Sequence, residues 1–126
     1  LRDLIRLHAY NLTRHPVAVV LNWNTIVTDS MDTLIQSFLS SSAQVWYTTT
    51  NDTTTTSTTT TTTTVDSLLI KPSSDALNAI LTAYQTTTYS DVGGWNGDSG
   101  IMGIQTLEGF LTYYYTTNNN NNAVHV

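Results

Sequence analysis

Apolar and polar side chains alternate at helical spacing over the first residues of the chain. The apolar side of this pattern consists of Leu1, Leu4, Ile5, His8 and Leu12. The spacing predicts an amphipathic helix over residues 1–11, which Pro16 prevents from continuing. Residues 17–21, VAVVL, are an uninterrupted apolar run of mostly β-branched side chains. This run predicts a short strand that is buried on both faces in a parallel sheet.

The pattern then returns to helical spacing over residues 30–39. Either Asp29 or Ser30 is suited to cap this second helix. Its apolar side consists of Met31, Leu34, Ile35 and Phe38. Residues 44–47 follow as a second short strand. Strands that alternate with helices point to an α/β layer architecture.

The second half of the chain repeats this alternation. Residues 68–70 predict an apolar strand, and residues 71–75 form a turn into a helix. The apolar face of that helix consists of Ala76, Ile80, Leu81 and Tyr84. Residues 93–100 contain four of the six glycines and therefore predict a loop. Helical spacing resumes over residues 101–115, with one ring of the three tyrosines at 113–115 expected to be buried.

Two homopolymeric tracts interrupt these elements. Threonine occupies 14 of the 17 positions from 48 to 64, and residues 118–122 are all asparagine. Neither tract offers a hydrophobic face. We therefore expect a disordered or loosely extended surface insertion at 48–64 and an Asn-rich tail at 118–122.

Composition narrows the classes of function. The chain has 126 residues, a net charge of -5 and only four Lys and Arg residues, which are too few for a nucleic-acid surface. No apolar run reaches the roughly 18 residues that cross a bilayer, so we expect no membrane segment in this chain. The absence of Cys excludes a disulfide framework, a thiolate zinc site and a cysteine nucleophile. The compartment stays open between Golgi or secretory and cytoplasmic.

Three motifs resemble the glycogenin-like transferases of glycosyltransferase family 8. LNWNT at residues 21–25 stands where that family has a strand followed by Asp-x-Asp, and the MDTL helix comes after it. LLIKPS at residues 68–73 is similar to the family's strand and KPS turn, and GDSG at residues 97–100 is similar to its Gly-Asp-Gln-Gly. The resemblance implies a GT-A-like α/β domain, a mixed sheet flanked by helices, of which residues 1–126 form a partial catalytic domain.

The resemblance also implies a site. In the family the Asp-x-Asp carboxylates hold a divalent cation, usually Mn²⁺, and here Asn22 and Asn24 occupy those metal positions. Asp98 corresponds to the position near the donor sugar or acceptor and is the expected catalytic residue. Gly97 and Ser99 complete the expected substrate-binding segment with Asp98. A carboxamide brings no negative charge to a hard cation, so the two asparagines weaken the expected metal site.

The function that the resemblance implies is transfer of a hexose from a UDP-sugar to a hydroxyl of a carbohydrate, protein or lipid acceptor. Two alternatives remain open from the residues. One is a catalytically inactive relative that binds a sugar nucleotide or carbohydrate. The other is a non-enzymatic, low-complexity surface protein in which the tracts are the functional part. Asn22 and Asn24 also suit a plain turn at the end of a strand.

Overall fold

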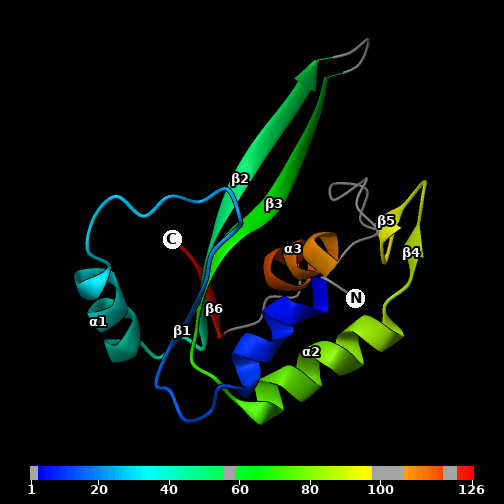
Figure 1. Cartoon of the computed structure of the whole chain (residues 1–126). Helices are drawn as coiled ribbons and strands as arrows, with labels where there is room; N and C mark the ends of the chain where they lie inside the picture. Colours follow the sequence, from blue (N-terminus) through cyan, green and yellow to red (C-terminus); the bar gives the residue numbers. More distant parts are fainter. Residues whose placement is uncertain (1–2, 56–58, 98–106, 118–121) are drawn as a thin grey trace.

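The computed structural model describes residues 3–55, 59–97, 107–117 and 122–126, and its main sheet has four strands in the order β1-β3-β2-β6 (Figure 1). The strands are β1 (Ala18–Val20), β2 (Val45–Thr55), β3 (Thr59–Ile70) and β6 (Ala123–His125). Both β1 and β2 run antiparallel to β3, whereas β6 runs parallel to β2. The sheet is therefore mixed, and the helices that flank it make the fold α/β, as the sequence predicts.

The helices are divided between the two sides of this sheet (Figure 1). One side carries the 3₁₀-helix η1 (Asp3–Asn11) together with α2 (Ser74–Thr86) and α3 (Leu107–Thr117), and the other carries α1 (Asp32–Ser40). A small second sheet pairs β4 (Tyr89–Ser90) with β5 (Gly94–Trp95). None of the described helices is long and apolar enough to cross a membrane.

The alternation of side chains along each strand explains why helices pack on both faces of the sheet. Val45 and Tyr47 of β2 are buried in the main core, which lies between the sheet and the three-helix side. Trp46, between them, points to the opposite face, because successive side chains of a strand alternate. There its ring lies 5.4 Å from the ring of Phe38 in α1, and Lys71 Nζ lies 5.1 Å from the same Phe38 ring.

Aromatic side chains dominate the main core on the three-helix side. Phe110 of α3 is fully buried and contacts Trp95 and Tyr84, with ring centroids 5.3 Å and 5.0 Å away. Burying such rings removes 150–250 Å² each from water, roughly the largest contribution a single side chain makes. All three tyrosines at 113–115 are buried, at 5–7% exposure, whereas the sequence predicted one.

The first helix differs from its prediction. It is a 3₁₀-helix, whose roughly 3.0 residues per turn change which side chains share a side relative to the expected 3.6-residue spacing. His8 and Leu12 are exposed, while Leu7, Ala9 and Tyr10 are buried.

The prediction of a parallel sheet around residues 17–21 is also wrong. The strand is limited to Ala18–Val20 and pairs antiparallel with residues 68–70, and Leu21 is already 36% exposed. The helix after it begins at Asp32 with Met31 as its N-cap and no side-chain capping bond. The Ser30 hydroxyl, one residue before that N-cap, nevertheless accepts from the Asp32 N–H at 3.2 Å, whereas the Asp29 carboxylate accepts from the Ser30 N–H and not from the helix. On the expected apolar side of α1 only Phe38 is buried.

The described parts of the threonine tract, residues 48–55 and 59–64, form strands, whereas the composition predicted a disordered or loosely extended insertion. Residues 45–55 and 59–70 form one long antiparallel hairpin, which projects well beyond the rest of the sheet (Figure 1). The apolar ends of both strands, residues 45–47 and 68–70, are paired within the sheet, and the threonines continue the same ladder outward. β-branched threonine suits such an extension because it favours strand geometry.

The remaining predictions are met in part. The α2 helix begins after Lys71 and Pro72 as expected, and the Ser73 hydroxyl caps it by accepting from the Ala76 N–H at 3.3 Å. The expected loop at 93–100 contains the short strand β5, and its residues 98–100 lie outside the described part. Of the helix expected over 101–115, residues 101–106 also lie outside the described part.

Candidate functional site

The loop that follows β1 carries a polar cluster centred on Asn22. The Asn22 side-chain oxygen accepts hydrogen bonds from Arg6 Nη2 at 3.2 Å and from the backbone N–H of Trp23 at 2.8 Å. Its amide nitrogen donates to Asp66 Oδ1 at 3.2 Å. One carboxamide thus connects η1, the end of β1 and the long strand β3.

A β-bulge explains why Asp66 reaches this cluster. Thr48 pairs with Ser67 and Thr49 pairs with Val65, so Asp66 is the extra residue of β3 between them. A bulge bends the strand and redirects the side chain of its extra residue. Sequence reasoning missed Asp66 and Arg6 as site residues, because no local pattern marks a bulge inside a polar strand.

The contacts of Asn22 are unfavourable for binding a divalent cation. Its carboxamide oxygen is the atom that would bind a metal, and it already accepts from a guanidinium group that would repel one. Asn24, the second expected metal position, is exposed. Within the described ranges, no group of three or more His, Asp or Glu side chains could hold a metal ion.

An open hollow of about 390 Å³ lies beside the cluster. It is lined by Arg6, Ala9, Val19, Val20, Leu21 and Trp23. Most of this lining is apolar, and Arg6 belongs to both the hollow and the cluster. The Trp23 side chain is 92% exposed. A tryptophan so exposed is unusual, since this residue is highly buried on average. We call the hollow together with Asn22 and Asp66 the Trp23 site.

The second group of expected site residues lies apart in the sequence, after β5. Asp98 and Ser99 fall outside the described residues, so their expected roles stay predictions. Gly97 is exposed and has a φ of +78°, which favours glycine, and a Cβ there would meet nothing within 4 Å.

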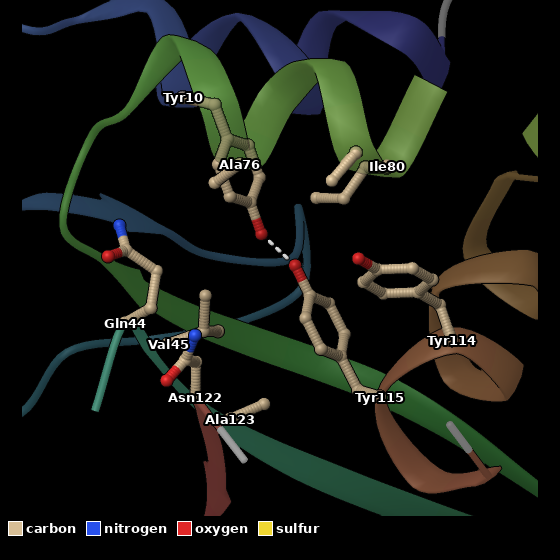
Figure 2. A pocket seen from close by; sticks show the side chains of 10 residues that line it. Tyr10, Gln44, Val45, Ala76, Ile80, Tyr114, Tyr115, Asn122 and Ala123 are labelled. Atoms are coloured by element: carbon tan, nitrogen blue, oxygen red, sulfur yellow. Dashed lines mark hydrogen bonds between the residues drawn. The ribbon is translucent and has the colours of Figure 1, made fainter. Parts of the chain in front are cut away.

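A second cavity, of about 110 Å³, lies between α2, α3 and the start of β2 (Figure 2). The hydroxyl groups of Tyr10 and Tyr115 are hydrogen-bonded to each other at this cavity, and Gln44 and Asn122 also line it. Ligand pockets commonly reach about 300 Å³ or more, so this cavity is small for a sugar or a nucleotide. The volume of the hollow at Trp23 falls within that range.

Burial sets the ionisation of the tyrosines near this cavity. Burial raises the pKa of Tyr115 far above its ordinary value, and it raises the pKa of Tyr47 as well. Their rings stack, with centroids 5.7 Å apart. A tyrosine phenol is already neutral at physiological pH, and the raised pKa values keep these two neutral at higher pH as well, which suits a structural role in the core.

Comparison of the chain with family models, with curated proteins and with solved structures gave no match.

Proposed function

We propose that the chain binds neutral carbohydrate at the Trp23 site without transferring it. The observation that carries this proposal is the exposed indole of Trp23 beside the hydrogen-bonded Arg6, Asn22 and Asp66 side chains. The proposal corresponds to the carbohydrate-binding alternative that the sequence leaves open.

The chemistry of a pyranose matches this combination of groups. A sugar ring has an apolar face of C–H groups, which packs on a flat aromatic ring, and a rim of hydroxyls that both donate and accept. The Trp23 indole supplies the flat apolar surface. Arg6 donates, the Asp66 carboxylate accepts, and the Asn22 amide does both. The apolar residues of the hollow complete a lining with few polar groups, as ligand sites commonly have.

Charge favours a neutral sugar over a sugar nucleotide. The diphosphate of a UDP-sugar would meet the Asp66 carboxylate as well as Arg6, in a chain whose net charge is -5. Hexose transfer from such a donor would also need a cation to stabilise the leaving diphosphate. A shallow site with one stacking ring is expected to bind weakly, with a dissociation constant of about 1 mM.

Fluorescence quenching tests the proposal, because the three tryptophans differ in exposure. Trp23 is 92% exposed and Trp95 is 4% exposed, while Trp46 is half-buried, so acrylamide quenches mainly Trp23. We expect maltoheptaose or cellohexaose to protect Trp23 from acrylamide. The Asp66→Asn substitution should raise the dissociation constant obtained from this protection at least tenfold. Calorimetry should show that the Trp23→Ala variant binds the same oligosaccharides more weakly by a similar factor. Ile26→Ala is the matched control, since Ile26 is 83% exposed in the same loop but does not line the hollow.

The same preparation tests the transferase hypothesis. UDP-glucose is added with and without Mn²⁺, and free glucose is measured. Glucose release that depends on Mn²⁺ would contradict a non-catalytic role. Lack of protection by either oligosaccharide at about ten times the expected dissociation constant would refute carbohydrate binding at Trp23.

A further inference from the structure

The outer part of the long hairpin has no neighbouring strand in the described sheet. The β1 strand pairs with residues 68–70 of β3, and β6 pairs with residues 45–47 of β2. Beyond these, residues 51–55 and 59–63 pair only with each other among the described strands. An isolated two-stranded ribbon is only marginally stable in water.

The hydrogen bond of the Val65 N–H shows which backbone groups of β3 point away from β2. The Val65 N–H donates to Thr112 Oγ1 of α3 at 3.0 Å, so this N–H points away from β2. The N–H groups of an antiparallel strand point to alternate sides, and the pairing is regular from Val65 to Thr59. The N–H groups of residues 59, 61 and 63 therefore point to the outer edge, and those of 60, 62 and 64 point to β2.

The sequence of this edge lacks the residues that commonly prevent an edge strand from pairing with another chain. Residues 59–64 are six consecutive threonines, without proline, glycine or charge. Edge strands of monomeric proteins are commonly protected by lysine, proline or a bulge. Here the bulge lies at Asp66, at the inner end of the ribbon. The outer edge therefore combines high strand propensity with backbone groups that no described strand pairs.

We propose that residues 59–64 pair with the same segment of a second copy of this chain. Two β3 edges related by a two-fold axis would form an antiparallel pair, which joins the hairpins into one four-stranded ribbon. A second copy of the chain is a suitable partner for this edge, because the pairing needs only backbone groups and a strand of the same length, and the same segment of the second copy supplies both. It brings no like charges opposite each other within 59–64, whereas the β2 edge carries Asp52.

Sedimentation equilibrium of the full chain tests the proposal. We expect the mass to rise from 13.9 kDa towards twice that value as concentration increases up to about 1 mM. Thr61→Pro removes an outward N–H and leaves the bonds to β2 in place, so it should weaken association at least tenfold. The double substitution Thr61→Lys with Thr63→Lys should have the same effect. Thr82→Lys with Thr86→Lys adds equal charge on exposed positions of α2 and should leave association unchanged.

Amide hydrogen exchange makes the test independent of variant folding. In the wild-type chain, protection of residues 59, 61 and 63 should increase with concentration, while protection of 60, 62 and 64 should not depend on it. A chain that remains monomeric up to about 1 mM would overturn the proposal. So would a dimer that Thr61→Pro leaves intact, or protection that rises equally at odd and even positions.

Discussion

Thr112 connects α3 to the inner end of the long hairpin, and its replacement by valine should destabilise the fold. The Thr112 side chain is fully buried, and its Oγ1 accepts from the Val65 N–H at 3.0 Å. Valine has nearly the same shape, so it opens no cavity. It removes the acceptor and leaves a buried N–H without this partner, which costs about 1–3 kcal/mol. We expect a loss of about 2 kcal/mol in the free energy of unfolding.

Urea denaturation followed by circular dichroism measures this loss, with an unchanged slope against urea showing that only stability has changed. Thr116→Val is the matched control in the same helix. Thr116 is exposed and its hydroxyl donates to the Thr112 backbone carbonyl, so its replacement should change stability by only about 0.5 kcal/mol or less. Thr112→Ser keeps the acceptor and loses one methyl group, at a cost of about 1 kcal/mol.

Exchange of the Val65 amide gives a local readout of the same bond. It should accelerate in Thr112→Val and remain slow in Thr112→Ser. The reasoning is refuted if Thr112→Val destabilises the chain no more than Thr116→Val does, or if the valine and serine variants lose stability equally.

Two further predictions concern the core and the site loop. Burial raises the pKa of Tyr115 in the folded state above the unfolded value of about 10, so stability should be fully present below about pH 10 and should fall as pH rises further. Urea denaturation of Tyr115→Phe at neutral and alkaline pH should show a smaller alkaline loss than the wild-type chain, and an equal loss would contradict this assignment. Thr25 Oγ1 is buried with no hydrogen-bond partner among the described residues, so Thr25→Val should raise the melting temperature through a gain of about 1 kcal/mol, whereas the exposed Thr28→Val should not.

The best sequence predictions concern elements that carry their own local signals. Pro72 and Ser73 mark the start of α2, because proline suits a helix entry and the serine hydroxyl caps the first free N–H groups. The strand segments at 45–47 and 68–70 are recognisable from their apolar residues alone, although the expected strand began one residue earlier, at Gln44. The α/β class follows from the order of these elements.

Other features depend on partners that are distant in sequence. The expected apolar face of the first helix fails at His8 and Leu12, because 3₁₀ geometry changes which residues share a side. The threonine tract offers no hydrophobic pattern, so its strand structure depends on pairing of residues 45–55 with 59–70. Asn22 was singled out by the sequence as a metal position, but its bonds to Arg6 and Asp66 come from separate elements.

The sequence by itself determined the local character of the chain: where α2 begins, where the short apolar strand segments lie, which runs are apolar, and that few charges are available. Those properties depend on residue type and near neighbours. Only the tertiary structure decided the strand directions, the bulge that brings Asp66 to Asn22, and the exposure of Trp23. These depend on which distant segments pair, and a periodic pattern of apolar residues carries no information about that choice.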